Sequence, residues 1–267
     1  MKYITSTELQ ALGKTREFQA YLPLLLRRLI INNIGFEHFE ILNLPGGDSI
    51  WKPGYDGVIK TTVKSILGDP GEYIIECGQS EKIEDKFKSD LKKRTREKEI
   101  ENQKYKVFVF ITTHKFQNKE GIIKKAKENF SWKDIKIFDA DDIEAWLDFD
   151  PATTSWLAYI LEKPRNNVKS FEEIQSNWLA STKVPLDKHV ILARADSANT
   201  MEIVKSWSKN HDNRILQIRS DSREESLLFF MSSIEQSGFR TETIESIKSK
   251  IVIVYNIEEW RQIVETK

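Results

Sequence analysis

Residues 54–78 read GYDGVIKTTVKSILGDPGEYIIECG, and this stretch decides the fold. Residues 58–63 and 73–77 are rich in β-branched and aromatic side chains, which is typical of β-strands. The Gly-Asp-Pro-Gly segment at 68–71 has the residues of a tight turn, because Gly accepts a positive φ and Pro presets φ near −65°. The sequence therefore predicts a β-hairpin with its turn at 68–71.

Two acidic residues lie near the open end of this hairpin. If Thr62 pairs with Glu72, Val58 lies opposite Glu76, and Asp56 becomes a diagonal neighbour of Glu76 on the same face. Diagonal neighbours are roughly 7–8 Å apart, so one cation could bind both carboxylates. Glu76 follows Tyr-Ile-Ile, where an unpaired carboxylate would be costly. The alternative interpretation is a pair of solvated charges at a strand end.

A highly charged helix is expected after the hairpin, over residues 81–103. Ile83, Phe87 and Leu91 recur at i, i+4 and i+8 and predict one narrow buried stripe. A neighbouring face is basic, and it either contacts phosphates or forms i,i+4 ion pairs in solvent. Its principal residues are Lys82, Lys86, Lys93 and Arg94.

The order of elements along the chain predicts an α/β protein with two domains. A continuous apolar run over 106–113 suits a central strand and is followed by a helix, a strand and two further helices. A proline and two asparagines near residue 165 indicate a linker. Three strand–helix alternations follow, which predict a smaller parallel sheet. We therefore expect domains over 1–163 and 164–267. The three strands of the second domain are expected at 189–193, 215–218 and 251–255.

Composition restricts the function classes. The chain has 267 residues and a net charge of zero, so any surface that attracts nucleic acid must be local. One cysteine and four scattered histidines give neither a disulfide framework nor a zinc site. The N-terminus lacks an apolar signal segment, and no run approaches the ~20 apolar residues of a membrane span. We expect a cytoplasmic protein without a membrane association.

The arrangement of Asp56, a hairpin, Glu76 and a following helix resembles the active-site core of the PD-(D/E)xK, or restriction-endonuclease-like, nuclease superfamily. With the helix sequence as far as Thr95, it is similar to the nuclease-like N-terminal domain of bacterial anti-phage defence proteins that also carry a STAND-type NTPase. This resemblance covers most of residues 16–162. It implies a mixed sheet flanked by helices. The second domain more weakly resembles the segment that links the nuclease-like domain to the NTPase, which implies a longer protein; the alternative is an intact protein with an α/β accessory domain.

The sequence departs from the superfamily pattern at one position. The superfamily lysine would stand two residues after Glu76, where this chain has Gly78. Either the lysine function has moved to the following helix, with Lys86 the first candidate and Lys82 the second, or the domain is catalytically impaired. Gln79 is expected to contribute a neutral ligand or to orient water.

The resemblance implies a Mg²⁺-dependent endonuclease in which Asp56 and Glu76 hold the metal, with Mn²⁺ as a substitute. Lys82, Lys93 and Arg94 would contact phosphates. The expected substrate is double-stranded DNA cut with weak sequence specificity, because nothing in the chain looks like a base-reading element; RNA stays an open alternative. Cutting both strands needs two sites, so a homo-oligomer is expected, and a C-terminal NTPase or sensor would complete the protein. The alternative function is a catalytically inactive binding or assembly module.

Overall fold

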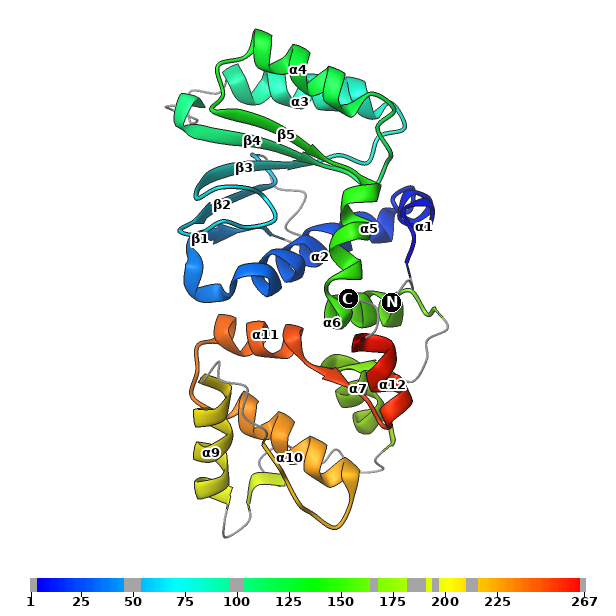
Figure 1. Cartoon of the computed structure of the whole chain (residues 1–267), viewed down its shortest axis with the longest axis vertical. Helices are drawn as coiled ribbons and strands as arrows, with labels where there is room; N and C mark the ends of the chain where they lie inside the picture. Colours follow the sequence, from blue (N-terminus) through cyan, green and yellow to red (C-terminus); the bar gives the residue numbers. More distant parts are fainter. Residues whose placement is uncertain are drawn as a thin grey trace.

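The computed structural model describes residues 4–45, 54–96, 103–163, 168–181, 191–193, 197–209 and 216–264. A five-stranded sheet forms its N-terminal part (Figure 1). The strands follow one another in chain order across the sheet, with β1–β2–β3 antiparallel and β3–β4–β5 parallel, so the predicted mixed sheet is confirmed. The strands are β1 (Phe39–Asn43), β2 (Gly57–Thr61), β3 (Gly71–Cys77), β4 (Lys106–Ile111) and β5 (Asp134–Phe138).

Helices cover both faces of this sheet, and two apolar clusters fill the space between the layers. Tyr73 and Ile75 of β3 face one cluster, whereas Ile74 faces the other, as strand alternation requires. The first face is covered by α1 (Ser6–Leu12), α2 (Arg16–Ile34), α5 (Ala140–Asp148) and α6 (Pro151–Ile160). The second is covered by α3 (Ile83–Arg96) and α4 (Lys119–Asn129). Short 3₁₀ turns precede β1 and β4, at Phe36–His38 and Gln103–Tyr105.

α2 is one continuous helix that runs through Pro23. The hydroxyl of Thr15 caps its start by accepting a hydrogen bond from the Phe18 amide. Pro23 lies inside the helix, where a proline costs about 3 kcal/mol. Leucines on both sides of it, including Leu22 and Leu26, are almost completely buried against the sheet. Their burial at about 1.5–3 kcal/mol each outweighs the proline cost.

The hairpin differs from the predicted one by a shift of two residues. Lys60, rather than Thr62, pairs with Glu72, and Val58 pairs with Ile74. The reason is the position of the turn, which closes between Ser65 and Gly68 through reciprocal backbone hydrogen bonds instead of at 68–71. A shift by an even number of residues leaves every side chain on its predicted face.

The C-terminal part is mostly helical, and the predicted parallel sheet is wrong for the residues that the structure describes. Residues 191–192 are helical, and 216–220 form no strand, because Leu216 and Ile218 are only partly buried and no strand pairs with them. The remaining positions of these two predicted strands, 189–190 and 215, lie outside the described residues. The strands found are β6 (Lys169–Ser170) and β7 (Val252–Ile253), which pair antiparallel. The helices are α7 (Phe171–Ser181), α9 (Ser197–Lys209), α10 (Arg223–Glu235), α11 (Thr241–Lys250) and α12 (Ile257–Val264).

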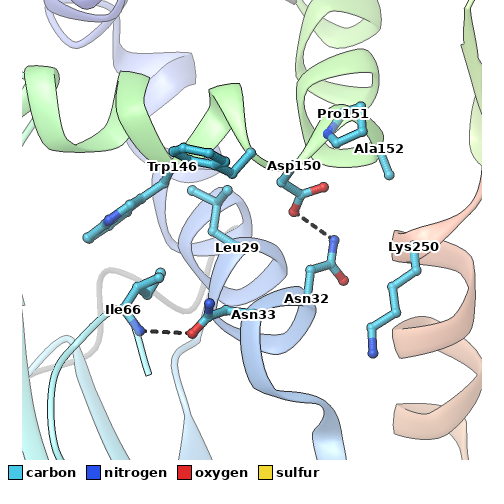
Figure 2. Close-up of a pocket in the computed structure, with 10 residues that line it drawn as sticks. Leu29, Asn32, Asn33, Ile66, Trp146, Asp150, Pro151, Ala152 and Lys250 are labelled. Carbon is cyan, nitrogen blue, oxygen red and sulfur yellow. Dashed lines mark hydrogen bonds between the residues drawn. The ribbon is translucent and has the colours of Figure 1, made fainter. Parts of the chain in front are cut away.

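α11 packs against α2 and α6, and Asn32 is the centre of this contact. The Asn32 amide nitrogen donates to Asp150 Oδ2 at 2.8 Å, to Thr153 Oγ1 at 3.1 Å and to the carbonyl of Ser249 at 2.9 Å. The Ser249 hydroxyl donates back to Asn32 Oδ1 at 2.6 Å. A cavity of about 400 Å³ lies beside this network, with Lys250 on its α11 side (Figure 2). The polar groups of Asn32 and Asp150 are therefore satisfied within the protein.

Candidate active site

Asp56 and Glu76 lie on the same face of the hairpin, the face that α3 covers. In the observed register Val58 pairs with Ile74, and both belong to the apolar cluster beneath α3 and α4. Continuing this register by two residues sets Asp56 opposite Glu76, and strand alternation points both carboxylates toward α3. Asp56 and Glu76 therefore share a face of the hairpin, as predicted. They lie directly opposite each other, whereas the sequence predicted a diagonal pair.

Glu76 is buried and forms an ion pair with Arg94. Its side chain is 4% exposed and that of Arg94 is 3% exposed, and Arg94 Nε donates to Glu76 Oε1 at 2.5 Å. The same guanidinium donates to the backbone carbonyl of Gly54, two residues before Asp56. Burial raises the pKa of Glu76 to about 7; the hydrogen bond from Arg94 opposes this increase, and the charge of Asp56 adds to it.

Asp56 is held at the end of the hairpin by a backbone contact. Its Oδ2 accepts a hydrogen bond from the Cys77 amide at 2.6 Å. Burial has the largest effect and raises the pKa of Asp56 above its ordinary value. The hydrogen bond from the Cys77 amide lowers this pKa, and the positive charge of Lys86 lowers it by a smaller amount. Lys86 itself forms an ion pair with Asp90 on α3, so its proposed role in place of the lysine at position 78 stays a prediction.

A third carboxylate, Asp90, lies in the same neighbourhood. Its Oδ1 accepts a hydrogen bond from Lys86 Nζ at 2.8 Å, and its charge raises the pKa of both Asp56 and Glu76. Asp90 is 5% exposed, and its Oδ2 is buried without a hydrogen-bond partner among the described residues. A buried carboxylate oxygen of this kind favours a cation beside it.

The donor set fits a hard divalent cation. Carboxylate oxygens are the ligands that Mg²⁺ prefers, and Mg²⁺ keeps several waters, so two protein carboxylates suffice. In the part of the chain that the structure describes, no group of three or more His, Cys, Asp or Glu side chains is arranged to hold a metal. Asp56 and Glu76 are the two carboxylates that would hold such an ion, and Oε1 of Glu76 is hydrogen-bonded to Arg94 in this structure.

Position 78 has no room for the superfamily lysine. A Cβ added to Gly78 would come within 2.2 Å of Cζ of Phe110. Phe110 is fully buried and packs edge-on against Phe87 and Phe116. The ring of Phe110 therefore fills the space that a side chain at position 78 needs.

Gln79 does not join the carboxylates. Its Oε1 accepts a hydrogen bond from Thr113 Oγ1 at 2.7 Å, and Gly13 of the α1–α2 connection lies against both side chains. Strand alternation gives the same result, because Gln79 is three residues from Glu76 and faces the α1 side of the sheet. Gln79 thus contacts Thr113, and its predicted role as a neutral ligand or in orienting water stays a prediction.

The basic residues of α3 divide into exposed and buried ones. Lys82 and Lys93 are exposed, as contact with phosphates requires. Arg94 is buried in its ion pair with Glu76, so its predicted position on an exposed face is wrong. Asp90 and Arg94 share the buried face of α3 with Leu91, at the spacing of a helix. The sequence does contain a signal for the buried positions of Asp90 and Arg94. Both charged residues fall, at helical spacing, within a stripe that is otherwise apolar.

No helix in the described ranges combines the length and the apolar character that a membrane crossing requires. No protein-family model, no curated protein and no solved structure matches this chain.

Proposed function

We propose that this chain is a metal-dependent nuclease of the PD-(D/E)xK type. The observation that carries the proposal is the shared face of Asp56 and Glu76 at the open end of one hairpin, beside Lys86. A solvated strand end would not place one carboxylate opposite another that is 4% exposed. Asp56 is partly buried and Glu76 is buried, and carboxyl groups whose pKa is raised in this way are typical of functional sites.

Asp56 and Glu76 would hold a Mg²⁺ ion, for which Mn²⁺ could substitute. The ion lowers the pKa of a bound water and stabilises negative charge on a scissile phosphate. In the reaction a water oxygen adds to phosphorus, one P–O ester bond breaks, and the leaving alkoxide takes up a proton. Lys86 would orient the attacking water or offset charge on the phosphate, and Asp90 keeps the Lys86 ammonium in position.

Arg94 acts in this proposal as a positioning residue. Its guanidinium fixes the carboxylate of Glu76 and connects α3 to the backbone at Gly54. Charge-assisted hydrogen bonds of this kind orient a carboxylate more strictly than neutral ones do. Lys82 and Lys93 would contact the nucleic acid backbone, which contributes affinity without sequence specificity. The proposed substrate is double-stranded DNA.

A catalytically inactive, nuclease-like module is the second candidate. Two observations favour it: Arg94 already neutralises Glu76, and Phe110 fills the space beside Gly78. Such a module would use the same fold to bind a partner. Whether the chain is a nuclease or an inactive module, the proposal includes four further properties: a homo-oligomer, a C-terminal NTPase, a role in anti-phage defence and a cytoplasmic location.

The test is degradation of plasmid DNA in Mg²⁺ or Mn²⁺ by the wild type and by matched variants. We expect Asp56→Asn and Glu76→Gln to abolish activity. Lys86→Ala should reduce it by about 10²-fold or more, the usual range for a group that assists proton transfer. The matched control is Lys88→Ala, because Lys88 also forms an i,i+4 ion pair on α3, with Glu84 at 3.8 Å.

Metal binding gives an independent measurement. Titration calorimetry with Mn²⁺ should show one or two sites in the wild type and weaker binding in Asp56→Asn, with circular dichroism as a check on folding. DNA degradation in neither metal, together with no heat of Mn²⁺ binding, would favour the inactive module. Activity that persists in Asp56→Asn would contradict both the metal site and the nuclease proposal.

A further inference from the structure

A groove of about 660 Å³ lies between α3 and α4. Figure 1 shows these two helices on one side of the sheet. Its floor is apolar. Phe87, Leu91 and Ala126 are buried at its base, and Ile122 and Phe130 are partly buried along it. The apolar surface that the groove offers to a partner therefore comes from Ile122 and Phe130, above the buried side chains.

The rims of the groove are basic. Lys88, Lys92 and Arg96 follow one another at intervals of four residues, so they form a single row along α3. Lys125 stands on the α4 rim, and the one acidic residue among those lining the groove is Glu84. All four basic side chains are exposed. Within the described residues, no ion pair involves Lys92, Arg96 or Lys125, so their charges are available to a partner.

This row is separate from the candidate active site. On a helix with 3.6 residues per turn, Lys86 and Lys93 project to one flank of the buried stripe, and Lys82 immediately precedes the helix. Lys88 and Lys92 project to the other flank, toward α4. α3 therefore carries two basic surfaces, one beside the carboxylates and one along the groove.

We propose that this groove binds an acidic amphipathic helix of a partner protein. An apolar stripe at i, i+3, i+4 and i+7 matches a hydrophobic floor between two helices, and acids beside that stripe match the rows of lysine and arginine. Glu84 lies at the start of α3, whereas Lys92 and Arg96 lie toward its end. The acidic side chains of the partner should therefore gather at the end of the groove near Arg96.

A nucleic acid strand fits this groove less well. Its phosphates would lie over Leu91 and Ala126 and lose hydration without compensation. Phe87 is 1% exposed, so it offers no open ring face for base stacking. The groove therefore favours a protein partner, independently of any nuclease activity.

The experiment is a selection of helical peptides against the immobilised full chain. A random library of 14-residue peptides, the length of α3, is panned on the wild type, with the Lys88→Glu/Lys92→Glu variant as the counter-target. We expect enriched peptides with an apolar stripe flanked by Asp and Glu. Their affinity for the Lys88→Glu/Lys92→Glu variant should fall by about tenfold or more, since two favourable charge contacts become repulsive.

The matched control is Lys82→Glu/Lys93→Glu, which reverses one charge on the other flank of α3 and one immediately before its first residue. Peptides that bind the groove should bind this variant as tightly as the wild type. The proposal is overturned if the enriched peptides are basic or lack an apolar stripe, if both double variants weaken binding equally, or if no peptide is enriched. Single-stranded DNA that loses affinity only for Lys88→Glu/Lys92→Glu would instead assign the groove to nucleic acid.

Discussion

Arg94 and Glu76 form a buried ion pair in which Arg94 Nε donates to Glu76 Oε1 at 2.5 Å and neither side chain is more than 4% exposed. This pair joins the middle of the sheet to the last turn of α3. Breaking a buried pair by removing one partner is strongly destabilising, because the remaining charge has lost its solvation as well as its partner.

Arg94→Ala should lower the free energy of unfolding by about 3–5 kcal/mol at pH 8. The loss should be smaller at pH 5, where Glu76 can take up a proton and become neutral. Urea denaturation at the two pH values measures both quantities. The control is Lys93→Ala, an exposed neighbour whose removal should cost no more than about 0.5 kcal/mol. Equal losses for both variants would contradict the ion pair.

The contribution of Glu76 to the stability of the wild type should fall as the pH rises from 5 to 8. The pKa of Glu76 is raised from 4.5 in the unfolded chain to about 7 in the folded one, so the native state binds more protons in that window. This group should thus contribute up to about 3 kcal/mol of stability at pH 5 that is lost by pH 8. Glu76→Gln should reduce the slope of unfolding free energy against pH, and an unchanged slope would refute the assignment.

Gly78→Ala should destabilise the fold by about 1–3 kcal/mol, because the new Cβ would overlap the ring of Phe110. Gly71→Ala is the matched control: its Cβ would meet no atom closer than Lys133 Nζ at 3.6 Å. Thermal unfolding of the two variants compares them directly. Gly78→Lys should for the same reason fail to increase DNA degradation, whereas a gain in activity would show that position 78 can accommodate the superfamily lysine.

Asn32→Ala should destabilise the contact between α2 and α11. The substitution removes the amide that links Asp150 of the α6 cap to the Ser249 backbone, and leaves polar groups unpaired at a cost of about 1–3 kcal/mol. Asn129→Ala is the control, because Asn129 donates only to the Lys125 carbonyl on the exposed side of α4. Hydrogen exchange should increase across residues 241–250 in the first variant alone.

Much of the N-terminal sheet could be predicted from local signals. The apolar run of β4 and the alternation of helices and strands up to Ile160 predicted the order of elements, because each signal lies within a few residues of the element that it specifies. The hairpin register could not be predicted as reliably. The Gly-Asp-Pro-Gly segment is a strong turn signal, yet the chain turns earlier, at Ser65–Gly68, where the backbone groups of these two residues pair with each other.

The candidate site was predictable in part for a related reason. An error of two residues in the predicted register leaves each side chain on the same face of the sheet. The prediction that Asp56 and Glu76 share a face was therefore correct despite the wrong register. The contact of Gln79 with Thr113 could not be predicted, because its position depends on Thr113 and Gly13, which are distant in sequence. In the C-terminal part, apolar segments resembled strands, but a strand forms only where another strand pairs with it, and the sequence does not specify that partner.

The guanidinium of Arg94 binds both the carboxylate of Glu76 and the carbonyl of Gly54. The two contacts use different nitrogens, Nε for Glu76 and Nη2 for Gly54, so one side chain fixes both an acid and the chain segment that leads to Asp56. A substitution that removes this guanidinium therefore frees both contacts at once.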